Sequence, residues 1–201
     1  MELYINNQKI DIKLENEKTV GEVLKALQIE AEKNSATITE ISVDDKIIAA
    51  HEFDEEAKKE LKENTKISVQ MISTFDIDDS LKNVCELLLK SGKDLLEIPV
   101  LLQTNKNKEA DLFIKNFADY FNSFCHVISL TSLFPEKYSK FLIGENNINE
   151  FFKDFSPVIN DLYEAYESKD FVTVADLCEY EISPQLLQIS NSVKEFLENK
   201  E

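Results

Sequence analysis

The stretch Thr19-Val20-Gly21-Glu22-Val23-Leu24 decides how the first third of the chain is read. Thr19 followed three residues later by Glu22 is a capping box, in which each side chain accepts a hydrogen bond from the other residue's backbone N–H. Apolar residues then recur at i, i+3, i+4 and i+7, ending with Leu27. This spacing predicts an amphipathic helix that ends near Lys33-Asn34.

Short runs of alternating apolar residues predict strands on both sides of this helix. Leu3–Ile5 and Ile10–Leu14 flank Asn6-Asn7-Gln8, which predicts a β-hairpin because Asn tolerates the positive φ of a tight turn. After the helix, the sequence predicts a strand at 38–43, a turn at 44–46, a short strand at 47–48, a short acidic helix at 54–61 and a last strand at 67–71.

This order of strand, strand, helix, strand, short strand, short helix and strand resembles the ubiquitin-like β-grasp fold. In particular, residues 1–73 resemble the small bacterial ubiquitin-like proteins that act as accessory proteins without being conjugated. Conjugated and sulfur-carrying members of that group end in a flexible Gly-Gly tail. Here Met71 is followed by Ile72-Ser73-Thr74-Phe75-Asp76, so the resemblance implies neither conjugation nor sulfur carriage.

From residue 74 onward, the apolar residues recur at helical spacing. The pattern predicts six or seven helices joined by short loops, which favours an antiparallel bundle. Asp78 or Asp79 would cap the first helix, Gly92 would end it, and Pro184 would start the last. A short helix is expected at 136–143. The expected fold class is therefore α+β, with a ubiquitin-like β-grasp domain at 1–73 and an acidic all-α bundle at 74–201.

Composition excludes several classes of function. The 201 residues include 22 Lys, no Arg and 39 acidic residues, for a net charge of −17. This charge repels phosphate backbones and anionic lipid, so we expect no nucleic-acid partner and no membrane partner. Three Gly are too few for a phosphate-binding loop.

No apolar stretch is long enough for a signal peptide or a membrane span, and the sparse cysteines are typical of reduced thiols. We therefore expect a cytoplasmic protein.

Candidate catalytic and metal-binding residues do not form a recognisable motif. His51-Glu52 lacks a second His four residues on, where Glu55 stands. Cys125 and His126 are adjacent on a predicted helix, where their side chains would point about 100° apart. Asp76, Asp78 and Asp79 lack the Gly and Glu positions of a calcium loop. We expect no catalytic residue, no metal site and no cofactor.

Two features instead favour a protein-binding surface. Aromatic residues are more numerous in the predicted bundle than one core seam requires, which suggests a homodimer face or a groove for a partner helix. The segment 170–184 combines acidic and aromatic residues before a Pro, and it is either a helix–Pro–helix corner or a docking surface. The candidate partner-binding residues are Phe151, Phe152, Phe155, Tyr163, Tyr166, Glu179, Tyr180 and Glu181.

These observations predict a non-enzymatic, cytosolic protein-interaction or accessory protein. Small acidic helical proteins with aromatic grooves are similar in general character to export chaperones and assembly factors of secretion or flagellar systems. The expected partner is another protein, through a helical segment or as a homodimer. The alternative is a small-molecule sensor or enzyme with a pocket in the bundle near Tyr120, Cys125, His126 and Tyr163. A nucleic-acid mimic would need acids along one face, whereas here they are scattered.

Overall fold

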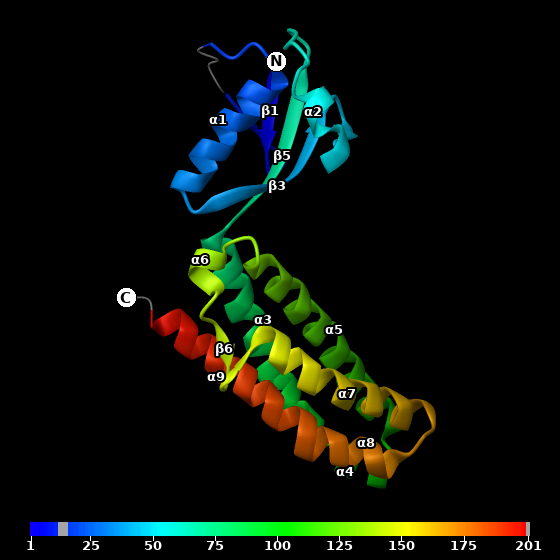
Figure 1. The fold of residues 1–201 in the computed structure, drawn as a ribbon. Coiled ribbons are helices and arrows are strands. Elements are labelled where there is room, and N and C mark those ends of the chain that lie inside the picture. Colours follow the sequence, from blue (N-terminus) through cyan, green and yellow to red (C-terminus); the bar gives the residue numbers. More distant parts are fainter. Residues whose placement is uncertain (12–15, 200–201) are drawn as a thin grey trace. The chain divides into compact units, whose positions relative to one another are not determined.

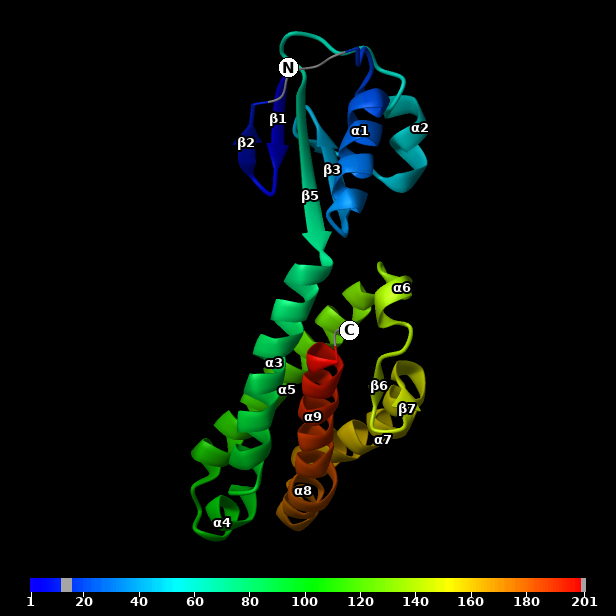
Figure 2. The same cartoon turned by 90° about the vertical axis from the view of Figure 1, so that its left-hand side faces the viewer.

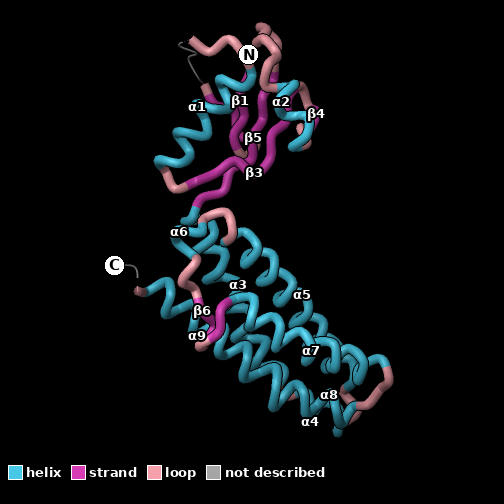
Figure 3. The backbone as a smooth tube through the Cα atoms, viewed as in Figure 1, coloured by secondary structure: helices cyan, strands magenta, loops and turns pink. Residues whose placement is uncertain are grey.

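The computed structural model describes residues 1–11 and 16–199. Contacts divide the chain into two compact units, Met1–Ile77 and Asp78–Glu201, and each is described by itself. The first unit is a mixed five-stranded sheet with helices, and the second is mainly helical (Figures 1 and 3). The expected α+β class is therefore confirmed.

The sheet of the first unit has the strand order β2-β1-β5-β3-β4. The central strands β1 and β5 are parallel, and the other neighbours pair antiparallel. Helix α1 lies against the sheet (Figures 1 and 2). The elements are β1 (Glu2–Ile5), β2 (Gln8–Ile10), α1 (Val20–Lys33), β3 (Ala36–Val43), β4 (Lys46–Ile47), the 3-10 helix η1 (Ala50–Glu52), α2 (Phe53–Glu56) and β5 (Lys66–Ser73).

Local sequence signals explain these elements. The predicted capping box of α1 is present, since Thr19 accepts from the Glu22 N–H and Glu22 accepts from the Thr19 N–H. The hairpin turns have positive φ at Asn6-Asn7 and at Asp44-Asp45, the geometry for which these residues are suited. Of the predicted second strand, Ile10 ends β2, whereas Ile12 and Leu14 lie outside the described residues.

The core of the first unit forms between one face of the sheet and α1. Its buried members alternate along β1, β3 and β5 and recur at helical spacing along α1, as a sheet face and a helix stripe require. They are Leu3, Val20, Val23, Leu24, Leu27, Val43, Ile67 and Val69.

The helical unit contains most of helix α3 (Thr74–Leu95), which follows β5 directly in sequence. Figures 1 and 2 show α3, α5 and α9 running alongside one another and α8 continuing into α9. The remaining elements are α4 (Ile98–Gln103), α5 (Asn107–Thr131), α6 (Pro135–Tyr138), β6 (Leu142–Ile143), β7 (Asn146–Asn147), α7 (Ile148–Glu167), α8 (Phe171–Asp176), the π-helix η2 (Leu177–Ile182) and α9 (Ser183–Glu198).

The predicted ends of α3 were wrong. Helix α3 begins before Asp78, because Ser73 and Asp76 bond each other's backbone N–H groups and cap it there. Gly92 does not end the helix, which continues to Leu95. Gly92 instead lies against α9, where an added Cβ would be 3.5 Å from the Leu186 Cβ.

A short hairpin is the second difference from the predicted helices. Helix α6 stops at Tyr138, and the stretch that was expected to continue it to Ile143 forms the two-residue strand β6, paired with β7. Gly144 opens the turn between them with φ +62°, a conformation that favours glycine. The unit is therefore mainly helical, not purely so.

Candidate functional site

The π-helix η2 is the most unusual backbone feature of the helical unit. It joins α8 to α9 without a break, since the residues at both junctions are helical. The predicted helix–Pro–helix corner is thus wrong: Pro184 lies just after the junction of η2 and α9, and the helix continues through it. Single-turn π segments inside α-helices occur frequently at functional sites.

The sequence explains why a π segment forms here. Buried residues recur every fourth position, at Val174, Cys178, Ile182 and Leu186. In an α-helix, a step of four residues drifts by about 40°, so the last of four such residues would lie about 120° around the helix from the first. A π-helix bonds residue i to residue i+5 and winds more residues into each turn. It therefore keeps these four side chains on one buried stripe.

Ser183 stabilises the wide turn. The Cys178 carbonyl accepts hydrogen bonds from the Ser183 backbone N–H and from its Oγ, the latter at 2.8 Å. The same Oγ lies 2.9 Å from the Gly92 carbonyl of α3. Ser183 is buried, so these bonds satisfy polar groups that water cannot reach.

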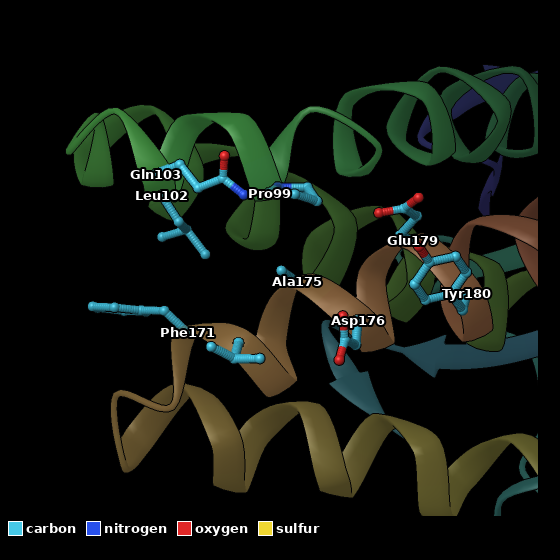
Figure 4. A pocket seen from close by; sticks show the side chains of 9 residues that line it. Pro99, Leu102, Gln103, Phe171, Ala175, Asp176, Glu179 and Tyr180 are labelled. Atoms are coloured by element: carbon cyan, nitrogen blue, oxygen red, sulfur yellow. The ribbon is translucent and has the colours of Figure 1, made fainter.

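A groove of about 410 Å³ lies beside this segment, between α4 and α8–η2. Figure 4 shows Pro99, Leu102 and Gln103 on one side and Phe171, Ala175 and Asp176 on the other. The full lining is Pro99, Leu102, Gln103, Phe171, Val172, Ala175, Asp176, Glu179 and Tyr180. We call this the π-helix groove.

The π-helix groove combines exposed apolar groups with negative charge. Val172 is 72% exposed and Tyr180 is 65% exposed. Asp176 and Glu179 supply two carboxylates, and the lining contains no Lys. The pKa of Tyr180 is raised above its usual value, chiefly because its side chain hydrogen-bonds to Glu179. The arrangement can receive an apolar side chain and a cation together.

A second groove, of about 280 Å³, lies between α5 and α7. We call it the α5–α7 groove. Its lining contains no charged residue: Ile114, Phe117, Ala118, Phe121, Asn122, Cys125, Ile159, Leu162, Tyr163 and Tyr166. The Tyr166 hydroxyl donates to Asp111 Oδ1 at 2.7 Å, and this bond raises the pKa of Tyr166.

The eight residues predicted to bind a partner fall in four places. Glu179 and Tyr180 line the π-helix groove, and Tyr163 and Tyr166 line the α5–α7 groove. Glu181 is exposed but lines neither groove.

Two of the three predicted phenylalanines belong to the core. Phe151 and Phe155 are buried, at 4% and 3% exposure, whereas Phe152 is half-buried. All three join a ring cluster with Phe121 and Phe124 of α5, with ring centroids 5.3–6.4 Å apart. Phe151 and Phe155 cannot form an exposed docking face, because other side chains already cover them.

The α4 side of the π-helix groove was missed by the sequence reasoning. Nothing in the spacing of Pro99 and Leu102 along the sequence predicts that α4 faces α8. The period of four from Val174 to Leu186 was the available signal for the π segment.

The pocket residues proposed for a sensor or enzyme are only partly brought together. Cys125 and Tyr163 line the α5–α7 groove, whereas Tyr120 and His126 do not. Burial raises the pKa of the Cys125 thiol, which disfavours the thiolate that nucleophilic chemistry requires.

Asp78, Lys137 and Tyr138 form an ionisable cluster in which Asp78 and Tyr138 are buried. Lys137 Nζ lies 2.6 Å from Asp78 Oδ2, and the Tyr138 hydroxyl lies 2.8 Å from Oδ1. Burial, followed by the bond to Asp78, raises the pKa of Tyr138. The Lys137 and Tyr138 side chains of α6 both donate to the Asp78 carboxylate of α3. The cluster therefore stabilises the contact between these two helices.

Within residues 1–11 and 16–199, no group of three or more His, Cys, Asp or Glu side chains could hold a metal ion. No helix in the same ranges has both the length and the apolarity to span a bilayer.

Comparisons with known proteins match both parts of the chain. Residues 1–73 match the family model described as "TP0873 N-terminal domain", and residues 79–192 match "Domain of unknown function (DUF8042)". A protein of Treponema pallidum (strain Nichols), described as an uncharacterized protein, is 25% identical over 193 residues, which cover 96% of each chain. No solved structure matches.

Proposed function

Because the chain belongs to the family described as "Domain of unknown function (DUF8042)", whose description names no activity, we propose a function from its geometry. It is a non-enzymatic protein-interaction or accessory protein that binds a segment of a partner protein in the π-helix groove. The observation that carries this proposal is the pairing of exposed apolar groups with two carboxylates in one groove.

The lining specifies the chemistry of the bound segment. Val172 and Tyr180 expose apolar surface that would be buried by an aliphatic or aromatic side chain, and tyrosine is common among the residues that dominate binding energy. Asp176 and Glu179 favour a Lys or Arg beside that side chain. An acidic segment would be repelled, so a second copy of this groove is excluded as the occupant.

Cross-linking from within the groove tests the proposal. A photo-reactive amino acid at Val172, introduced into the full chain in its native cells, is expected to form a covalent adduct with one protein. The matched control position is Leu187, which is 50% exposed and lines neither groove. The Asp176→Lys/Glu179→Lys variant should abolish the adduct.

The charge control is the Glu136→Lys/Glu195→Lys variant, which reverses two exposed acids outside the groove. It should keep the adduct at Val172. Equal adducts from positions 172 and 187, or no adduct from position 172, would contradict the proposal.

A more specific role follows from the general character of the chain. If it is a chaperone or assembly factor of a secretion or flagellar system, the protein captured at Val172 is a component of such a system. Mass spectrometry of the adduct identifies it. Capture of a protein unrelated to export or motility would exclude this role and leave the binding function intact.

We infer for the first unit a ubiquitin-like β-grasp domain of the non-conjugated type. The strand order β2-β1-β5-β3-β4, the parallel β1–β5 pair and the placement of α1 after the first hairpin support this assignment. Ser73 ends β5 and Thr74 begins α3, so the position of a conjugating tail is occupied by a helix. An adduct between the C-terminal end of β5 and another protein would contradict the non-conjugated type.

A further inference from the structure

We propose that the α5–α7 groove binds an amphipathic helix of a partner protein, with an apolar stripe and Lys or Arg beside it. This surface is separate from the π-helix groove, because the two linings share no residue. The proposal stands whether or not the π-helix groove binds a partner.

The spacing of the lining residues defines a helical trough. On α5 the lining includes Ile114, Ala118, Phe121 and Cys125, at steps of four, three and four residues, and on α7 it includes Ile159, Leu162 and Tyr166. Such steps keep side chains on one face of each helix. The twelve residues from Ile114 to Cys125 extend over about 16 Å, or about three turns. An amphipathic guest helix of three to four turns matches that length.

Side-chain size shapes the trough. Ala118 is a small residue between the larger Ile114 and Phe121, which leaves room at the middle of the groove. Tyr163 is 65% exposed and forms a wall on the α7 side. The Tyr166 ring is held by its 2.7 Å bond to Asp111, so this part of the wall is fixed before a guest arrives.

The charge around the trough selects the guest. Helices α5 and α7 together carry eight acidic residues and three Lys over their whole length. The lining itself is uncharged, and one of the acids, Asp111, is held beside it by the bond to Tyr166. A guest with an apolar stripe between basic residues is attracted by this net negative charge, and an acidic helix is repelled. A second copy of this face would bring two negative surfaces together. The occupant is therefore a basic amphipathic helix, not another copy of this chain.

A synthetic peptide of about 14 residues, four turns long, tests the trough directly. Its sequence repeats Leu at helical spacing with Lys elsewhere, and the matched peptide carries Glu in place of Lys. Titration calorimetry with the full chain should show binding of the Lys peptide, and the Glu peptide should bind at least about tenfold more weakly.

Two tyrosines provide matched variants, because Tyr163 and Tyr180 are both 65% exposed and line different grooves. Tyr163→Ala should weaken binding of the Lys peptide about tenfold, whereas Tyr180→Ala should leave it unchanged. Ala118 is on the exposed face of α5, and Ala118→Glu places a carboxylate in the trough. This variant should also weaken binding, because the Leu stripe of the peptide would then face a charged side chain instead of an apolar one. Thermal unfolding confirms that each variant is folded.

Cys125 reports occupancy from within the groove. Bound Lys peptide should slow the reaction of Cys125 with a thiol reagent in proportion to the occupied fraction. In Tyr163→Ala the same protection should require about tenfold more peptide. The proposal is overturned if Tyr163→Ala binds the peptide as tightly as the unaltered chain, or if Tyr180→Ala alone weakens it. It is also overturned by a self-association that Tyr163→Ala abolishes, or by protection of Cys125 by a small apolar dye but not by the peptide.

Discussion

The Tyr138 hydroxyl donates a 2.8 Å hydrogen bond to Oδ1 of Asp78, which lies 60 residues earlier in the chain. Oδ2 of the same carboxylate pairs with Lys137 at 2.6 Å. Helix α6 contains only Pro135–Tyr138, too few residues to be stable alone. Its attachment to α3 therefore depends on this carboxylate, while Tyr138 and the following Phe141 pack against Phe196 of α9.

We predict that Asp78→Ala destabilises the helical unit by about 3 kcal/mol, because it leaves a buried hydroxyl and an ammonium group without the carboxylate. Tyr138→Phe should cost about 1 kcal/mol, since it removes one hydrogen bond and keeps the ring. Urea unfolding followed by far-UV circular dichroism measures both. A smaller effect for Asp78→Ala than for Tyr138→Phe would contradict the assignment.

The same cluster predicts a loss of stability at alkaline pH. The pKa of Tyr138 is raised in the folded chain by burial and by Asp78, so its neutral form is favoured there. Its contribution is complete below the unfolded tyrosine pKa of about 10, and it is lost as pH rises from there toward the folded value. Above about pH 10, the pKa of tyrosine in the unfolded chain, the urea midpoint should fall with rising pH in the unaltered chain. It should fall less steeply in Tyr138→Phe, which lacks this hydroxyl. Parallel curves would exclude this origin.

Two glycines should respond oppositely to alanine. At Gly92, inside α3, an added Cβ meets Leu186 Cβ at 3.5 Å, an ordinary contact, so Gly92→Ala should stabilise the helix by about 0.5–1 kcal/mol. At Gly21 the added atom would lie 2.9 Å from both the Cβ and the carbonyl oxygen of Ala57. Gly21→Ala should therefore destabilise the first unit by about 1–3 kcal/mol. Calorimetric unfolding of the two variants tests the contrast.

The three cysteines should differ in reactivity. Cys85 and Cys178 are buried, and burial raises the pKa of each thiol to about 12. Cys125 is half-buried at the α5–α7 groove. A thiol reagent should modify Cys125 first and reach the other two on unfolding, and Cys125→Ser should remove the early phase. Early reaction at Cys85 or Cys178 would show that the core opens more readily than its packing indicates.

Strong local signals were enough to predict much of the fold. The Thr19–Glu22 capping box, the Asn6-Asn7 turn and the stripe of α1 depend on neighbouring residues, and the structure contains all three. The predicted cap at Asp78 failed because Ser73 and Asp76 form a competing cap. The carboxylate of Asp78 pairs instead with Lys137 and Tyr138, which are 59 and 60 residues away. A local sequence pattern cannot predict such a contact.

The candidate sites were predictable only in part, for a related reason. The segment containing Glu179 and Tyr180 was recognised as unusual, and both residues line the π-helix groove. Phe151 and Phe155 were placed on a surface because an aromatic stripe has the same spacing whether it faces solvent or the rings of another helix. Only the packing of α5 against α7 distinguishes the two cases.

The π-helix also has a consequence for how this chain can change in length. Val174, Cys178, Ile182 and Leu186 are all buried, and an α-helix of the same length would turn them through about 120° from the first to the last. The π turn takes up one residue more than an α turn. A one-residue deletion between Val174 and Leu186 would therefore be absorbed by conversion of the π turn to an α turn, which keeps Phe171 and Asp176 of α8 at the groove. A one-residue insertion has no such outlet and would turn α8 by about 100° relative to α9. Family members that share this groove should therefore accept a one-residue gap in the segment more readily than a one-residue insertion.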